Sequence, residues 1–158
     1  MVQSISDNAD TSGRSRHRDV AIDTRLGEDC HDLGTLERAR LLLHREASAG
    51  WLILVPDTPA IDWHELDDAE FELINHQIRQ LCRWAAEWFG ADKMNIATIG
   101  NQVPQMHIHI VARHYHDPWW PKPVWGSSPD TPTAYEAESV QTMREALARD
   151  LKLMPAED

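Results

Sequence analysis

The sequence predicts an α+β domain in which an antiparallel β-sheet carries one long helix and a second helix near the C-terminus. Three observations lead to this prediction. Polar and apolar residues alternate strictly over residues 105–111, as in a strand whose two faces differ. Apolar residues recur at helical spacing over residues 67–89. Residues 93–99 form a further strand pattern, and Gly100-Asn101 then predicts a turn into the alternating stretch, which makes a hairpin.

Composition and charge exclude several classes of protein. A chain of 158 residues is expected to form one domain. Its net charge of −11 argues against a general nucleic-acid binder, which needs a basic surface. No apolar run approaches the ~18 residues of a membrane span, and no secretory signal is visible. Cys30 and Cys82 fit no metal or disulfide spacing, so we expect a reduced, cytoplasmic protein.

The N-terminal part of the chain divides near residue 20. Residues 1–19 are rich in Ser, Asp, Asn and Arg and almost without apolar side chains, which predicts a disordered tail. Residues 20–158 are expected to form the single domain. Residues 20–33 are mixed and fit a short helix or a turn, with residues 29–32 interpreted as a polar turn.

Two candidate strands precede the long helix. Residues 36–45 contain good helix formers, yet they also alternate, so the residues alone leave helix and strand open. Residues 51–56 are continuously apolar, which is typical of a short strand buried on both faces. Pro56 ends this strand because proline cannot donate to a β-ladder.

Two helices are predicted from periodicity. The long helix begins near Asp67 or Asp68, either of which can cap it, and Gly90 follows its end. Its predicted buried stripe comprises Phe71, Ile74, Ile78, Leu81 and Ala85. A second helix is expected over about 132–154, with a stripe of Val140, Met143, Leu147 and Leu151.

Prolines and tryptophans dominate residues 114–126, which we therefore interpret as a fixed loop over the sheet edge or the mouth of a site. Its tryptophans have two interpretations. They can stack on a nucleobase, or they can pack in the core or in a dimer contact; the three residues concerned are Trp119, Trp120 and Trp125.

The alternating stretch also carries the strongest chemical signal. Gln105, His107 and His109 are expected to share one face of the strand, about 6.5–7 Å apart at each step. The apolar residues between them would face the core. Histidine works as a base, a nucleophile or a metal ligand near neutral pH, so two histidines on one face indicate a site that performs chemistry.

Residues 103–113 resemble the signature of the histidine triad (HIT) superfamily, His-φ-His-φ-His-φ-φ, in which φ is apolar. Gln105 departs from it by replacing the first histidine. Residues 100–104 are similar to the glycine-rich turn before the motif, and the likeness covers roughly residues 36–126. It implies a sheet of about five antiparallel strands with a long helix packed on it, a C-terminal helix, a strand at residues 36–45 and a homodimer.

The resemblance also implies a function. Such proteins cleave a nucleoside phosphoanhydride or phosphoramidate, for example a diadenosine polyphosphate, as nucleotide hydrolases or nucleotidyl transferases. His107 holds the middle position and is the expected nucleophile, which forms a covalent nucleotidyl-histidine. A main-chain carbonyl near Gln105 would hold its other ring nitrogen. His109 is expected to contact phosphate and assist the leaving group, and in its protonated form it would offset developing charge.

Four further residues are predicted to bind substrate. Gln105 can hold the pocket geometry or contact phosphate, although an amide cannot titrate. Gln102 and Asn101 lie where the family places phosphate-contacting groups, and each can instead be a simple turn residue. Arg45 lies nearest the position at which the family holds ribose, and it can pair with phosphate.

Three alternatives stay open. His107 and His109 could bind zinc with His114 or His116 as a third ligand, which would make a metal-dependent hydrolase. The domain could instead be a non-catalytic module that binds a nucleotide or a partner, or its histidines could merely face solvent. We expect no cofactor and no metal held by the protein, although a divalent ion can accompany the substrate phosphates. The expected partners are a small nucleotide and a second copy of the chain, without nucleic acid or membrane.

Overall fold

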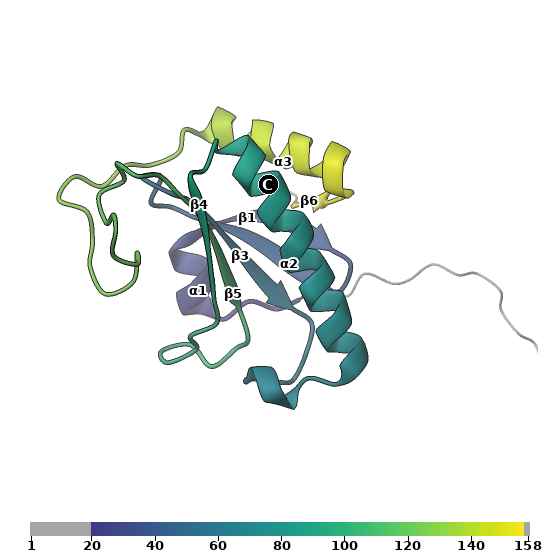
Figure 1. Cartoon of the computed structure of the whole chain (residues 1–158). Helices are drawn as coiled ribbons and strands as arrows, with labels where there is room; N and C mark the ends of the chain where they lie inside the picture. Colours follow the sequence, from purple (N-terminus) through teal and green to yellow (C-terminus); the bar gives the residue numbers. More distant parts are fainter. Residues whose placement is uncertain (1–19, 157–158) are drawn as a thin grey trace, which may run out of the picture.

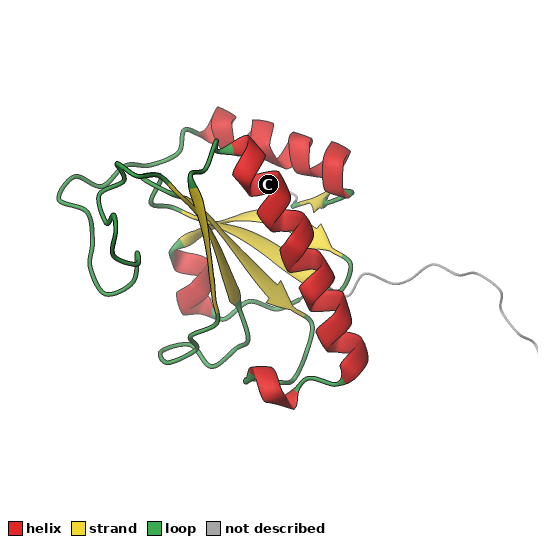
Figure 2. Ribbon diagram, viewed as in Figure 1, coloured by secondary structure: helices red, strands yellow, loops and turns green. Residues whose placement is uncertain are grey.

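An open antiparallel sheet of six strands forms the centre of the protein in the computed structural model, which describes residues 20–156 (Figures 1 and 2). The strand order is β4-β5-β3-β2-β1-β6. The strands are β1 Cys30–Leu36, β2 Ala39–His44, β3 Gly50–Pro56, β4 Lys93–Ala97, β5 Ile108–Arg113 and β6 Met154–Pro155. The helices are α1 Thr24–Glu28, α2 Asp68–Trp88 and α3 Ala137–Leu151, with a short 3-10 turn at Trp63–Glu65.

The predicted α+β class is confirmed, with the long helix and the C-terminal helix in place. The sheet has six strands, where about five were expected. The predicted tail at residues 1–19 lies outside the described residues. None of the helices in residues 20–156 is long and apolar enough to span a membrane.

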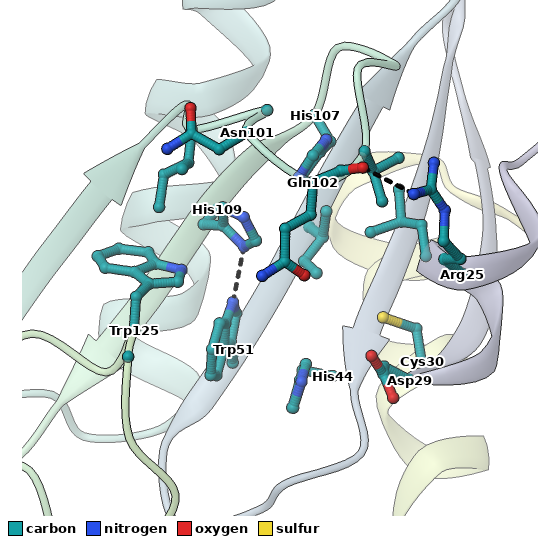
Figure 3. A pocket seen from close by; sticks show the side chains of 16 residues that line it. Arg25, Asp29, Cys30, His44, Trp51, Asn101, Gln102, His107, His109 and Trp125 are labelled. Atoms are coloured by element: carbon teal, nitrogen blue, oxygen red, sulfur yellow. Dashed lines mark hydrogen bonds between the residues drawn. The ribbon is translucent and has the colours of Figure 1, made fainter.

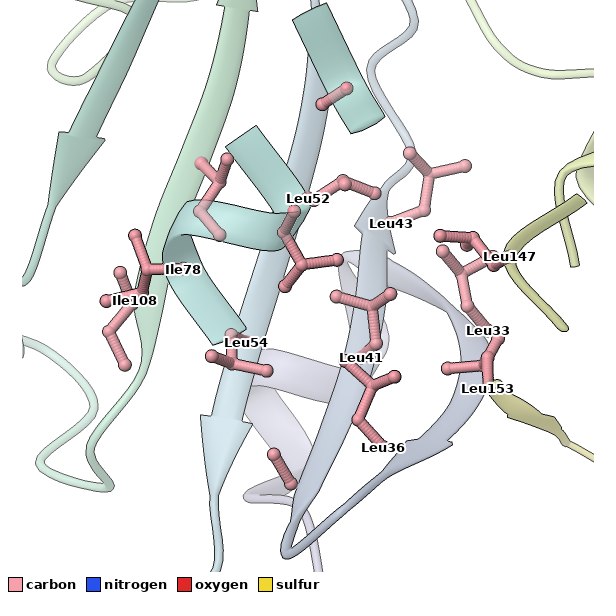
Figure 4. Packing of buried hydrophobic residues seen from close by; sticks show 14 of the residues in the cluster. Leu33, Leu36, Leu41, Leu43, Leu52, Leu54, Ile78, Ile108, Leu147 and Leu153 are labelled. Carbon is pink, nitrogen blue, oxygen red and sulfur yellow. The ribbon is translucent and has the colours of Figure 1, made fainter. Parts of the chain in front are cut away.

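The sheet is covered on both faces, and its strands divide their side chains between two apolar clusters. Leu41, Leu52 and Ile108 belong to the larger cluster, under α2 and α3 (Figure 4). Leu42 and Ile53 belong to the second cluster, which α1 and the tryptophan loop at residues 114–126 cover. Every residue of β3 is buried, which explains its continuously apolar sequence.

Helix α2 begins and ends as the sequence predicts. The Asp67 carboxylate accepts a hydrogen bond from the Glu70 amide at 2.8 Å, and Glu70 accepts one from the Asp67 amide at 3.3 Å, which forms a capping box. Gly90 follows the helix with a φ of 61°. Most of the predicted stripe is buried, but Phe71, in the first turn of the helix, is 43% exposed and contacts Trp63.

The sequence analysis interpreted residues 29–32 as a polar turn, and the structure corrects this. Residues 30–32 form the beginning of strand β1. Polar residues occur in this strand because Asp32 pairs with Arg40 on β2 and also accepts a hydrogen bond from the Gly34 amide at 3.0 Å. A bulge between Asp32 and Gly34 interrupts the alternation that would have indicated a strand. Gly34, with a φ of 135°, also lies so close to the backbone of Met154 that a side chain cannot be accommodated.

The predicted hairpin is present, but its connection is longer than expected. Lys93 pairs with Arg113 and Ala97 with His109, and the chain between them forms a loop over residues 98–107. Strand β5 therefore begins at Ile108, and His107 occupies the last position of the loop. The strand predicted at residues 36–45 is confirmed as β2, after a turn at residues 37–38.

A buried ion pair ties the tryptophan loop to the sheet. Arg113, at the end of β5, donates hydrogen bonds to the Asp117 carboxylate at 2.6 and 2.9 Å and to the carbonyl of Lys122 at 2.9 Å. Burial opposes ionisation of Asp117, but the hydrogen bonds from Arg113 and from the amides of His114 and Trp119 outweigh it and lower the carboxyl pKa. Arg113 thus anchors the loop to the end of β5 at Asp117 and Lys122.

Removing one partner of this pair should be strongly destabilising. In Asp117→Ala the guanidinium of Arg113, which is 1% exposed, loses its counter-charge inside the protein. We expect the free energy of unfolding in urea to fall by about 3–5 kcal/mol. Asp130→Ala, which removes an exposed acid from the following loop, should change it by less than about 0.5 kcal/mol. A loss below about 1 kcal/mol in Asp117→Ala would contradict the anchoring role.

Candidate active site

A pocket of about 370 Å³ opens on the face of the sheet opposite α2, where the two motif histidines lie (Figure 3). Strands β2, β3 and β5 form its floor. Helix α1 and the loop at residues 98–107 form its walls, together with Trp125. The lining side chains with polar atoms include Arg25, Asp29, Cys30, His44, Trp51, Asn101, Gln102, His107, His109 and Trp125.

His107 is held in one tautomer by the backbone. Its Nδ1 lies 2.6 Å from the carbonyl oxygen of Gln105. A carbonyl can only accept, so Nδ1 carries a proton, and in the neutral ring the lone pair is on Nε2. This is the contact that the family resemblance implied, and it survives the loss of the first histidine because it uses the main chain. In this tautomer the neutral imidazole presents Nε2 as the nitrogen that can attack an electrophile.

His109 has the opposite tautomer, which a side chain imposes. The indole Nε1–H of Trp51 donates to Nδ1 of His109 at 3.0 Å, in a buried contact. An indole nitrogen can only donate, so Nδ1 of His109 carries the lone pair and the proton of the neutral ring is on Nε2. The two rings lie 4.9 Å apart between centroids, at an angle of 79°. One histidine thus offers a lone pair and its neighbour offers an N–H donor.

His109 is neutral near pH 7 because its pKa is strongly lowered, so the protonated form considered above does not apply to this ring. Burial, followed by the nearby His107 and His44 rings, lowers its pKa to about 3. At neutral pH it can stabilise a phosphoryl oxygen through its N–H dipole, without carrying a full positive charge.

His44 is a pocket residue that the sequence analysis did not assign to the site. Its ring stacks on Trp51, with centroids 4.2 Å apart and planes 14° from parallel. Its Nδ1 accepts a hydrogen bond from the Glu46 amide at 3.1 Å. Burial lowers its pKa, although Asp29 and Glu46 act in the opposite direction. The alternation of β2 was the available signal, because it places His44 on the face opposite Leu41 and Leu43.

Helix α1 forms one wall of the pocket, a role that no local sequence pattern indicated. Arg25 and Leu26 come from this helix, and Asp29 and Cys30 follow it directly. Arg25 donates from Nη1 to the carbonyl of Gln102 at 2.8 Å, across 77 positions of sequence. Figure 3 shows that this contact lies at the edge of the pocket. Burial raises the pKa of Cys30 to about 12, so its thiol is not a nucleophile at neutral pH.

The structure brings together four of the six residues predicted for the site. His107, His109, Asn101 and Gln102 all line the pocket. Gln105 and Arg45 contact other parts of the described chain instead. The Arg45 Nε donates to the carbonyl of Glu28 at 3.1 Å, and its Nη1 lies 3.3 Å from Nδ1 of His31.

The Gln105 side chain points toward the N-terminal segment. Its amide oxygen accepts a hydrogen bond from the Asp23 amide at 2.8 Å, and its amide nitrogen donates to the carbonyl of Ala21 at 2.7 Å. Gln105 therefore contacts the backbone of residues 21–23 with its side chain and His107 with its carbonyl.

The tryptophans of the loop at residues 114–126 have different positions. Trp119 is buried in the second apolar cluster, and Trp120 contacts Tyr115 at an angle of 75°. Trp125 lines the pocket, with its ring centroid 5.4 Å from that of His109. Within residues 20–156, its Nε1 is buried without a hydrogen-bond partner.

Among residues 20–156, no three histidine, cysteine or acidic side chains form a group that could hold a metal ion. His114 and His116, the third ligands considered above, lie beside each other with centroids 5.6 Å apart. Neither lines the pocket that His107 and His109 share.

The fold, the pocket and the paired histidines identify the family. The model of the HIT domain matches residues 27–116. The chain is 38% identical to the histidine triad protein blr8122 from Bradyrhizobium japonicum, with 82% of this chain and 96% of that chain covered and a TM-score of 0.75. It is 34% identical to a histidine triad protein from Marinobacter aquaeolei VT8, with coverage of 85% and 98% and a TM-score of 0.76. The protein belongs to the HIT family. Comparison with curated protein sequences finds no match.

The tautomer of His109 provides a direct test of the site geometry. We expect ¹⁵N NMR to show a neutral ring protonated at Nε2 from pH 8 down to about pH 5, because the pKa of His109 is lowered to about 3. Trp51→Phe removes the indole donor and should produce a mixture of tautomers.

Trp125→Phe is the matched control, because its indole N–H is not bonded to His109; this variant should keep the single tautomer. An imidazolium signal from His109 near pH 6 would contradict the assignment.

Proposed function

We propose that the protein is a nucleotide hydrolase or nucleotidyl transferase that cleaves a nucleoside phosphoanhydride or phosphoramidate, such as a diadenosine polyphosphate. Membership of the HIT family supports nucleotide binding or a hydrolase or transferase activity. The observation that carries the proposal is the hydrogen bond from Nδ1 of His107 to the carbonyl of Gln105 at 2.6 Å. It directs a neutral nitrogen lone pair into a pocket of nucleotide-binding dimensions.

In the proposed reaction, Nε2 of His107 attacks the α-phosphorus and forms a P–N bond. The bond from phosphorus to the leaving group breaks, and the leaving group departs with the electron pair. The His107 ring becomes a nucleotidyl-imidazolium that keeps its proton on Nδ1, and this N–H still donates to the Gln105 carbonyl. Water then attacks phosphorus and loses a proton to solvent, the P–N bond breaks with its electron pair returning to Nε2, and the nucleoside monophosphate leaves with His107 restored.

His109 serves this reaction as a neutral donor. Its Nε2–H can hydrogen-bond a phosphoryl oxygen on which charge increases in the transition state. Because Trp51 holds its Nδ1, the ring need not reorient when substrate binds. Asn101 and Gln102 add amide groups from the loop at residues 98–107.

Three further expectations belong to this proposal. The protein acts as a homodimer in the cytoplasm, its substrate is a small nucleotide, and it requires no protein-bound metal. A divalent ion accompanies only the phosphates of the substrate. A metal-dependent hydrolase would need a third ligand beside His107 and His109.

The decisive experiment measures AMP release from a diadenosine polyphosphate, an adenosine phosphoramidate and ADP, each with and without chelator. His107→Ala should lower turnover by at least about 1,000-fold, because no other group in the pocket presents a comparable nucleophile. Its melting temperature should remain close to that of the unchanged protein. His76→Ala, an exposed histidine on α2, is the matched control and should retain full turnover.

A nucleotidyl adduct on His107, detected by mass spectrometry after rapid quenching, would support the covalent step. Turnover of His107→Ala within a few-fold of the unchanged protein would refute it. AMP binding without any turnover would instead favour a non-catalytic nucleotide-binding module. Loss of turnover with chelator, in a substrate that needs no metal on its phosphates, would favour the metal-dependent alternative.

A further inference from the structure

The Gln105 side chain, in the first position of the motif, contacts a distant segment of the backbone. Its amide hydrogen-bonds two backbone groups of one extended segment, the Asp23 N–H and the Ala21 carbonyl, at 2.8 and 2.7 Å. These partners are 82 and 84 positions away in the sequence. The side-chain amide thus pairs with residues 21–23 much as a neighbouring strand would.

The segment that Gln105 holds leads directly into helix α1. Asp23 is the N-cap of α1, and its carbonyl accepts hydrogen bonds from the Leu26 and Gly27 amides at 3.0 Å each. Leu26 is 7% exposed and packs in the second apolar cluster, close to the floor of the pocket. A change in the position of Asp23 would therefore move α1 and the pocket wall that it forms.

The same residue also holds the proposed nucleophile, but through a different group. The Gln105 carbonyl accepts the hydrogen bond from Nδ1 of His107 at 2.6 Å. Arg25 adds a second link between α1 and the loop at residues 98–107, through its bond to the Gln102 carbonyl at 2.8 Å. Gln105, in that loop, consequently anchors both the segment that leads into α1 and the His107 ring.

We propose that Gln105 is a positioning residue, which fixes helix α1 against the loop at residues 98–107 and so shapes the wall of the substrate pocket. It does not contact substrate or transfer a proton. The part of this proposal that concerns catalysis rests on the proposed function. The structural part, that Gln105 orders residues 20–28, is independent of it.

Histidine cannot replace glutamine in this role. The amide of Gln105 presents a donor and an acceptor on two atoms bonded to the same carbon, and both face residues 21–23. The two nitrogens of an imidazole point away from each other, and in the neutral ring only one is a donor. Gln105→His would restore the three-histidine motif yet lose at least one of the two hydrogen bonds.

The kinetic test uses Gln105→Ala and Gln105→His, because every variant at this position keeps the carbonyl that holds His107. We expect KM for the best substrate to rise about tenfold in both variants, in line with the loss of one or two hydrogen bonds. The kcat should remain within about threefold, since the tautomer of His107 is unchanged. Gln141→Ala, on the exposed face of α3, is the matched control and should change neither constant.

The physical test needs no substrate. Hydrogen exchange of the full chain should be faster by about tenfold at the Asp23, Leu26 and Gly27 amides in both variants. The amides of β2 and β3 should exchange as in the unchanged protein. This pattern distinguishes the loss of a local anchor from a general loss of stability, which would accelerate exchange throughout the sheet.

The outcomes separate this proposal from the proposed function. Unchanged exchange at residues 20–28 overturns the positioning role, whatever the kinetics. A fall in kcat at constant KM in Gln105→Ala, or a gain in kcat in Gln105→His, also overturns it, since either would mean that residue 105 takes part in the chemistry. If the unchanged protein turns over no substrate, the proposed function fails, and the exchange measurement alone decides the role of Gln105.

Discussion

The two-residue period of strand β5 is the constraint on which the rest of the structure depends. Ile108 and Ile110 are fully buried beneath α2, while His109 between them faces the pocket. A slip of one residue would exchange these faces and bury an imidazole in the apolar core. Because β5 is paired on both sides, with β3 and β4, its register is set by two ladders as well as by the core. The position of His109 therefore follows from the packing of the apolar residues on either side of it.

The pocket orients its histidines with neutral partners. A backbone carbonyl holds His107 and an indole N–H holds His109, so one ring presents a lone pair and the other a proton. A carboxylate in either place would favour imidazolium and remove the lone pair that a nucleophile needs. Burial acts in the same direction at His109 and His44, where it lowers the pKa of both rings. Such a site can meet an anionic phosphoryl group with hydrogen-bond donors that are already oriented.

Gln105 illustrates how a motif can change while its geometry persists. The carbonyl that holds His107 belongs to the backbone and is present whichever residue occupies position 105. The side chain is consequently free for another purpose, and here it bonds residues 21–23. The departure from the three-histidine pattern is thus compatible with an intact nucleophile. Arg113 is a second structural residue beside the motif, since its pairing with Asp117 anchors the loop that presents Trp125.

The sequence by itself determined the elements whose signals are local: the alternation around His107 and His109, the capped helix α2, the apolar strand β3 and the hairpin of β4 and β5. It also predicted four of the residues that line the pocket. The tertiary structure decided which distant groups these side chains contact. The bond from Trp51 to His109 spans 58 positions, and those from Gln105 to residues 21–23 span 82 and 84. Periodicity predicts which face of a strand or helix a side chain occupies. The group that the side chain contacts there depends on how distant segments of the chain pack. For that reason the α1 wall, the stacking of His44 on Trp51 and the tautomer of His109 emerged only from the folded chain.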